Sequence, residues 1–213
     1  MKIVILGAAG QIARLVTADL LAQTTHQLVL FARNGGKRLQ VTDKQRATIV
    51  EGDFQDEKSL SIAMDGADFV YVNAMDDTKG LKAILATMKE ENVNRIIGAS
   101  ILGIYDEVPG AFGAWNKRMV GEKRIKLMAE NVSLVETSGL DYTILRLTWL
   151  YNQKNNRAYD ITLNGEAFKG AQVTREAVSQ LIVDIINEPT EKYAKTSLGV
   201  SEPDTNWDKP SFY

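Results

Sequence analysis

An apolar run near the start of this chain leads directly into a glycine turn and then into a helical pattern. Residues 2–6 have the sequence KIVIL, and residues 7–13, GAAGQIA, follow without a break. Continuous aliphatic residues are typical of a strand that is buried on both faces of a sheet. A buried strand followed at once by a tight turn and a helix predicts an α/β fold.

The turn has the composition of an anion site. A strand that exits into a helix directs free backbone N–H groups and the positive end of the helix dipole at one point. Gly7 permits the sharp turn, Gly10 removes the Cβ that would keep a pyrophosphate from the backbone, and the small Ala13 allows close packing. The turn therefore predicts a dinucleotide site; the alternatives are a turn that binds nothing and a site for a different nucleotide. The predicted binding residues are Gly7, Ala9, Gly10, Gln11 and Ile12.

Composition excludes several classes of function. Hydrophobic residues make up 45% of the 213 residues and charged residues 24%, which suits one globular domain with a sizeable core. The formal net charge of -2 gives no basic field for a nucleic-acid partner. The chain has no cysteine and one histidine. Disulfides and thiolate catalysis are therefore excluded, and a metal site is not expected.

We expect a soluble, cytoplasmic protein with no membrane partner. The opening apolar stretch is too short for the core of a signal peptide, and no later run approaches the length of a membrane span. Residues 1–200 are predicted to form one domain. Residues 201–213 contain two prolines and several polar residues and are predicted to be an extended tail. The sequence leaves the oligomeric state open.

Strand and helix patterns alternate along most of the chain. Such alternation, with right-handed crossovers, predicts a doubly wound parallel sheet of the Rossmann type with a small C-terminal substrate region. The predicted strands are 2–6, 27–32, 47–51, 68–72, 95–99, 142–147 and 168–173. The predicted helices are 11–21, 58–64, 79–91, 115–137 and 175–187.

The residues that end the strands are candidates for the cofactor site, because ligands of such sheets bind at the carboxyl ends of the strands. Arg33 ends the second strand, where an acidic residue would accept from a ribose hydroxyl and an arginine would bind a 2′-phosphate. Lys37, Arg38 and Arg14 lie near it in the predicted fold. The predicted cofactor is therefore NADP(H); NAD(H) is the alternative if these are only solvated loop charges.

The residues that follow the later strands predict where the rest of the cofactor lies. Asp53 and Phe54 follow the third strand, where a carboxylate would accept from the adenine amino group and the ring would cover the base. Helix capping is the alternative role for Asp53. The residues predicted to flank the ribose and nicotinamide are Asn73, Ala74, Ser100, Ile101, Leu147 and Thr148.

Several segments resemble a known family. Residues 138–146, SGLDYTILR, are similar to those of NmrA-like, atypical short-chain dehydrogenases/reductases, as are the glycine turn and Arg33. Residues 102–110, LGIYDEVPG, resemble small bacterial NAD(P)-binding members of that group. The resemblance implies an NAD(P)H-binding reductase similar to flavin, biliverdin and quinone reductases.

One departure from the family bears on catalysis. Catalytic short-chain dehydrogenases carry a Tyr-x-x-x-Lys pair, in which the tyrosine supplies the proton and the lysine lowers its pKa and holds the nicotinamide ribose. Alignment places Lys126 at the lysine position and Glu122 at the tyrosine position. An ionised glutamate only accepts hydrogen bonds, so the missing phenol argues against ordinary carbonyl reduction. The alternative interpretation of Glu122 and Lys126 is an exposed i,i+4 ion pair.

A flat acceptor does not need this acid. A flavin or a quinone accepts hydride and then takes a proton from solvent, so the predicted activity is hydride transfer from NADP(H) to such a small molecule. Ser100 and Tyr105 are the candidate hydrogen-bond and proton donors; alternatively, Ser100 fixes its own loop and Tyr105 only packs. Trp149 and Tyr151 are candidates for the wall of a flat pocket or for the core.

Two other functions are compatible with the sequence. A non-catalytic NADP(H) sensor or regulatory protein, as some NmrA-like proteins are thought to be, is favoured by the missing Tyr-x-x-x-Lys pair. A sugar-nucleotide epimerase or dehydratase is less favoured, because the C-terminal part is short for a large substrate.

Overall fold

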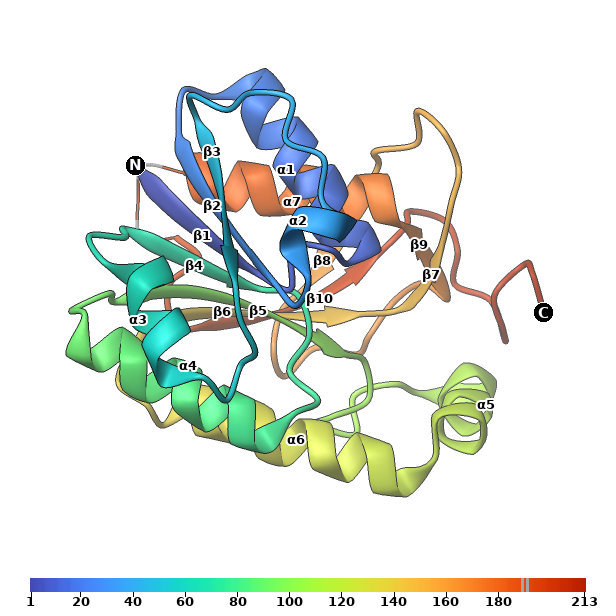
Figure 1. The fold of residues 1–213 in the computed structure, drawn as a ribbon. Helices are drawn as coiled ribbons and strands as arrows, with labels where there is room; N and C mark the ends of the chain where they lie inside the picture. Colours follow the sequence, from blue (N-terminus) through green and yellow to red (C-terminus); the bar gives the residue numbers. More distant parts are fainter. Residues whose placement is uncertain (189, 191) are drawn as a thin grey trace.

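The centre of the computed structural model is an eight-stranded, mostly parallel sheet (Figure 1). The structure describes residues 1–188, 190 and 192–213. The strands of the sheet are β1 (Lys2–Leu6), β2 (Gln27–Ala32), β3 (Ala47–Glu51), β4 (Phe69–Val72), β5 (Arg95–Ile101), β6 (Asp141–Leu147), β8 (Asp160–Thr162) and β10 (Thr196–Ser201). Their order is β3-β2-β1-β4-β5-β6-β10-β8, and all pairs are parallel except β10 with β8. The reversal of strand order between β1 and β4 confirms the predicted doubly wound fold.

Helices cover both faces of this sheet (Figure 1). One face carries α1 (Gln11–Gln23) and α7 (Arg175–Asn187), and the other carries α3 (Glu57–Met64), α4 (Thr78–Glu90) and α6 (Glu122–Glu136). Successive side chains of β1 lie in the hydrophobic cores on opposite faces of the sheet. Ile5 packs in the core with α1 and α7, and Leu6 packs in the core with α3, α4 and α6. This two-sided burial explains the apolar runs of the strands. Among the described residues, no helix is both long enough and apolar enough to span a membrane.

A buried carboxylate joins α7 to α1. Asp19 of α1 accepts a hydrogen bond from Ser179 Oγ of α7 at 2.6 Å and pairs with Arg157 Nη2 at 2.8 Å. The hydroxyl of Thr174 caps the start of α7. As a result, the first residues of α1 and α7 line one cavity at the carboxyl edge of the sheet.

The helix predicted over 115–137 is two helices. α5 (Gly110–Val120) ends at Gly121, whose φ of +83° and ψ of 138° lie outside the helical region, and α6 begins at the next residue. Glycine adopts such a conformation at little cost because it has no Cβ. α5 therefore points away from the sheet, while α6 lies along it (Figure 1).

The C-terminal region forms more strands than predicted. β10 lies between β6 and β8, and β7 (Trp149–Tyr151) pairs with β9 (Gln172–Thr174) in a separate two-stranded sheet. β9 starts four residues later than the strand predicted over 168–173. β7, β8 and β9 have three residues each, which is too short for a periodic pattern to identify.

The segment after β10 is packed on the body of the molecule. Residues 202–213, all of them described, contain no helix or strand. Thr205 is buried, and its carbonyl accepts from Ala171 N at 2.7 Å. The ring centroid of Tyr213 lies 5.1 Å from those of both Trp115 on α5 and Trp149 on β7. Aromatic contacts thus fasten the predicted tail to the neighbouring elements.

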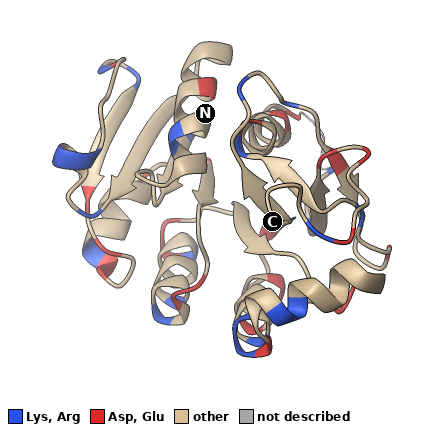
Figure 2. Ribbon diagram, turned by 90° about the vertical axis from the view of Figure 1, so that its right-hand side faces the viewer, with Lys and Arg blue, Asp and Glu red and all other residues tan. Residues whose placement is uncertain are grey.

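Charged residues lie mainly on the helices and loops (Figure 2). One arginine of the sheet is nevertheless fully buried. Arg146 Nη1 of β6 lies 2.8 Å from Glu107 Oε1, and its Nη2 donates to two backbone carbonyl groups at 3.0 and 3.2 Å. Glu107 also accepts from the backbone N–H groups of Gly103 and Tyr105, both at 3.0 Å. This buried pair therefore holds the loop after β5 against β6.

We expect Glu107→Gln to lower the free energy of unfolding by about 3–5 kcal/mol, because it leaves the buried charge of Arg146 without its partner. Urea unfolding followed by circular dichroism measures the change. Asp106→Asn is the matched control, because the ion pair of Asp106 with Lys117 is exposed and such pairs contribute little. Equal losses in the two variants would show that the buried pair does not hold this loop.

Candidate functional site

The glycine turn joins β1 to α1 and leaves the start of the helix open to a ligand. Gly7 has a φ of +80°, and the N–H groups of Gly7 and Ala8 both donate to Phe31 O of β2 at 3.0 Å. Gly10, the N-cap of α1, has an extended backbone. No described side chain caps this helix end, and its first turn carries no acidic residue. The first amides of α1 and its dipole are therefore available to an anion.

Gly10 also makes room for a side chain of the site. A Cβ on Gly10 would lie 2.3 Å from Asn73 Nδ2, closer than real Cβ contacts. Asn73 follows β4, and its Oδ1 accepts a hydrogen bond from the hydroxyl of the buried Tyr71 at 3.1 Å. Tyr71 thus turns the amide nitrogen of Asn73 towards the glycine turn. From the sequence, Gly10 is predicted only to admit the pyrophosphate, because this second constraint depends on a contact across the sheet edge.

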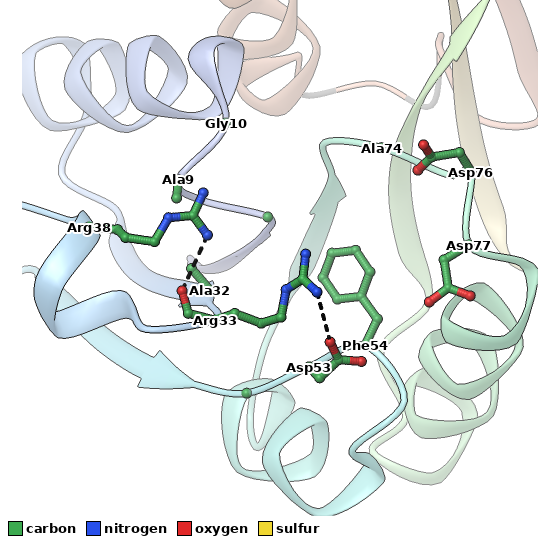
Figure 3. A pocket seen from close by; sticks show the side chains of 12 residues that line it. Ala9, Gly10, Ala32, Arg33, Arg38, Asp53, Phe54, Ala74, Asp76 and Asp77 are labelled. Atoms are coloured by element: carbon green, nitrogen blue, oxygen red, sulfur yellow. Dashed lines mark hydrogen bonds and ion pairs between the residues drawn. The ribbon is translucent and has the colours of Figure 1, made fainter.

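A cavity of about 360 Å³ extends from the turn along the ends of β2 and β3 (Figure 3). Arg33 and Arg38 line it. Arg33 Nη1 lies 3.6 Å from Asp53 Oδ2, and Arg38 Nη1 donates to Arg33 O at 3.3 Å. The Arg33 side chain is 75% exposed, so its pair with Asp53 is weak and the guanidinium is available to a ligand. Lys37 does not line the cavity, and Arg14 contacts it only indirectly, by donating to Arg38 O.

Asp53 and Phe54 lie on the β3 side of this cavity (Figure 3). Asp53 Oδ1 accepts from the backbone N–H two residues later at 3.1 Å, whereas Asp56 caps α3. The capping alternative for Asp53 is therefore wrong. The ring of Phe54 stacks on Phe31, with centroids 6.1 Å apart. The predicted residues that line this cavity are Gly7, Ala9, Gly10, Arg33, Asp53, Phe54 and Ala74.

A second cavity, of about 300 Å³, continues the first along the ends of β4, β5 and β6. Ala74 and Asp76 line both cavities, so the two form one groove. Ser100 is the last residue but one of β5; it is 3% exposed, and its Oγ has no hydrogen-bond partner among the described residues. A buried hydroxyl without a partner costs about 1–3 kcal/mol, which a polar ligand atom would relieve. The predicted residues that line this cavity are Gln11, Ile12, Asn73, Ala74, Ser100, Ile101, Leu147 and Thr148.

The second cavity is completed by residues that no sequence pattern indicated. α6 contributes Arg124 and Met128, and α7 contributes Arg175. The predicted wall residues Trp149 and Tyr151 do not line it, and Leu150 between them does. Neighbouring residues of a strand point to opposite sides, so β7 presents only its middle side chain to the groove. The other unpredicted lining residues are Met75, Asp76 and Ala99.

The structure does not bring Tyr105 or Lys126 to the groove. The hydroxyl of Tyr105 donates to Glu136 and contacts Ser197 Oγ at 3.2 Å, and burial raises the pKa of Tyr105. Lys126 has an 80% exposed side chain, and its Nζ lies 4.0 Å from Glu130. Lys126 therefore pairs with Glu130, one turn further along α6, and not with Glu122 as the alternative interpretation predicts. Neither residue lines either cavity.

The groove fits a dinucleotide. An uncapped helix start faces its middle, guanidinium groups and an aromatic ring line one end, and an unpartnered buried hydroxyl lines the other. The described residues contain no cluster of three or more side chains that would hold a metal ion.

Comparisons with known proteins agree with this fit. A family model described as NAD(P)H-binding matches residues 7–189. No curated protein matches the chain. A short-chain dehydrogenase/reductase from Veillonella parvula DSM 2008, solved in complex with NADP, is 38% identical with a TM-score of 0.95, and 99% of each chain is covered. A Rossmann-fold NAD(P)-binding family protein from Shigella flexneri is 35% identical with a TM-score of 0.82, covering 100% of this chain and 98% of that one.

A more distant likeness shows the fold alone. ChuY, an anaerobilin reductase from Escherichia coli O157:H7, is 20% identical with a TM-score of 0.77. The match covers 99% of this chain and 100% of ChuY. The arrangement of sheet and helices is therefore shared over the full length of both chains.

We expect Gly10→Ala to raise the Kd for NADPH about tenfold, because its Cβ would displace the amide of Asn73 or the start of α1. Fluorescence titration measures the Kd. In an Asn73→Ala background the same substitution is expected to have a much smaller effect, since the atom it meets is gone. An equal effect in both backgrounds would show that the Cβ obstructs the ligand directly.

Proposed function

Because the chain belongs to the NAD(P)H-binding protein family, we propose that it is an oxidoreductase that passes hydride from NADP(H) to a flat small-molecule acceptor such as a flavin or a quinone. The observation that carries the proposal is the second cavity. It offers the unpartnered hydroxyl of Ser100 beside apolar side chains. Its described lining includes no tyrosine, lysine or histidine. This lining suits an acceptor that needs binding and orientation but no protein acid.

Each half of the groove has its own task in this proposal. The amides at the start of α1 bind the diphosphate, and Asn73 donates from Nδ2 beside them. When bound, NADPH supplies a hydride, and a flavin or quinone that accepts it takes the accompanying proton from solvent. Ser100 donates a hydrogen bond to the acceptor or to the nicotinamide carboxamide. Leu147 and Met128 exclude water from the apolar side of the rings.

Preference for NADP(H) over NAD(H) is part of the proposal. Arg33 and Arg38 line the first cavity, where they would bind a 2′-phosphate, and Asp53 neutralises only part of their charge. The relative from Veillonella parvula, solved in complex with NADP, supports this assignment. Phe54 lies next to Asp53 and would cover one face of the adenine.

A second candidate function is a protein that binds NADP(H) and reports its redox state without turnover. The same lack of a proton donor in the second cavity favours it. In that case the groove would bind the reduced and oxidised nucleotides with different affinities and would not consume either.

The two functions differ in turnover. We expect the protein to oxidise NADPH in the presence of FMN, riboflavin or menadione, and not with benzaldehyde, which needs a proton donor. Loss of NADPH absorbance measures the rate. Ser100→Ala is expected to lower kcat/KM about tenfold, the equivalent of one hydrogen bond. Tight NADPH binding with no oxidation by any acceptor would refute the oxidoreductase and favour the sensor.

Arg33→Asp is expected to change the ratio of the Kd values for NADH and NADPH by about 10–100-fold towards NADH. The substitution removes charge-assisted hydrogen bonds to the 2′-phosphate and adds a repelling charge. Titration of each nucleotide measures the ratio. Arg118→Asp is the control, because Arg118 is an exposed arginine of α5 that lines neither cavity. An unchanged ratio in Arg33→Asp would exclude Arg33 as the phosphate-binding residue.

A further inference from the structure

We propose that the second cavity selects acceptors that carry an anionic group, a carboxylate or a phosphate, which Arg175 and Arg124 bind while Ser100 and the apolar wall hold the flat ring. This inference rests on the proposed function of the same cavity. It narrows the acceptor from flat molecules in general to flat molecules with a negatively charged substituent.

Arg175 is held at the cavity by the packing of its helix. It is the first residue of α7, directly after the capping Thr174. Asp19 fixes α7 beside α1 through Ser179. Arg175 therefore lines the same cavity as Gln11, the first residue of α1.

Among the described residues, no carboxylate pairs with Arg175. Its Nη1 donates to the neutral amide oxygen of Asn152 at 3.1 Å. The adjacent Glu176 instead lies 4.0 Å from Arg157 Nε and accepts from Asn155 N. Desolvation lowers the pKa of Arg175, and no carboxylate among the described residues raises it in return. A half-buried guanidinium that keeps its charge without a partner favours a ligand that supplies an anion.

Arg124 adds a second positive charge from the opposite face of the sheet. It lies in the first turn of α6, and its Nη2 is 4.0 Å from Asp76 Oδ2. Both side chains are more than half exposed, so this pair is loose. Asp76 is the single carboxylate among the described residues that line the cavity. Two guanidinium groups against one carboxylate leave the lining positively charged.

The rest of the lining suits an aromatic ring. Met75, Met128 and Leu147 are buried apolar residues of the cavity. Ser100 Oγ is buried and has no partner among the described residues, so a ring oxygen or nitrogen would satisfy it. The combination of an apolar wall, one hydroxyl and two guanidinium groups therefore matches a flat ring that ends in a carboxylate or a phosphate.

Binding of matched acceptor pairs to the complex of the protein with NADP⁺ tests the proposal, since the oxidised cofactor cannot reduce them. FMN against riboflavin tests a phosphate, and anthraquinone-2-carboxylate against its carboxamide tests a carboxylate. In at least one pair we expect the anionic member to bind about tenfold tighter or more, as charge-assisted hydrogen bonds predict. The pair that shows the difference identifies the anionic group.

Substitutions assign this preference to the arginines. We expect Arg175→Gln to reduce the affinity ratio to near one and Arg175→Lys to keep part of it. Arg124→Gln is expected to reduce the ratio partly. Lys126→Gln is the matched control, because it removes an exposed positive charge two residues from Arg124 that lies outside the cavity. Far-UV circular dichroism confirms that each variant is folded.

Several results would overturn the inference. The inference fails if both members bind equally in both pairs, or if none of the four compounds binds. It also fails if Lys126→Gln loses as much of the preference for the anionic member as Arg175→Gln does. If Arg175→Gln binds NADP⁺ more weakly but leaves the affinity ratio of the anionic and neutral acceptors unchanged, the inference is also overturned, since Arg175 would then bind the cofactor. A protein that shows the preference but does not oxidise NADPH would uphold the inference and refute the oxidoreductase.

Discussion

The hydrogen bonds from Gly7 and Ala8 to the carbonyl of Phe31 fix the bend on which the rest of the site depends. They turn the chain at the end of β1, so that α1 starts at the carboxyl edge of the sheet with its first amides facing the groove. The parallel pairing of β1 with β2 and β4 then brings Arg33 and Asn73 to the same edge. Because these strands run in one direction, a single bend sets the position of the ligand-facing residues.

The two halves of the groove are built differently. The first cavity is lined by residues at or after the ends of β1, β2, β3 and β4, all of them between residues 7 and 77. The second cavity also needs α6 and α7, which lie in the second half of the chain. Buried Asn131 of α6 donates to Met75 O at 2.7 Å and accepts from Thr78 Oγ1 at 2.8 Å, which fixes α6 to the loop after β4. Asp19 performs the corresponding role for α7.

The second cavity combines a positive lining with the absence of tyrosine, lysine and histidine from its described lining residues. Tyr105 is engaged by Glu136 on another part of the molecule, and Lys126 is exposed to solvent. What the cavity does offer is the hydroxyl of Ser100, apolar side chains and two guanidinium groups. Such a lining can orient a ligand and stabilise its charge.

The sequence by itself determined the doubly wound sheet and the glycine turn, because continuous apolar runs and small turn residues act locally. It also placed Arg33, Asp53, Asn73 and Ser100 at strand ends, and the parallel topology brought them to one groove. Only the tertiary structure decided the break at Gly121, the three-residue strands and the position of Arg124 and Arg175 at the second cavity. These depend on packing between segments far apart in the chain, and the periodicity of a single segment carries no record of such contacts.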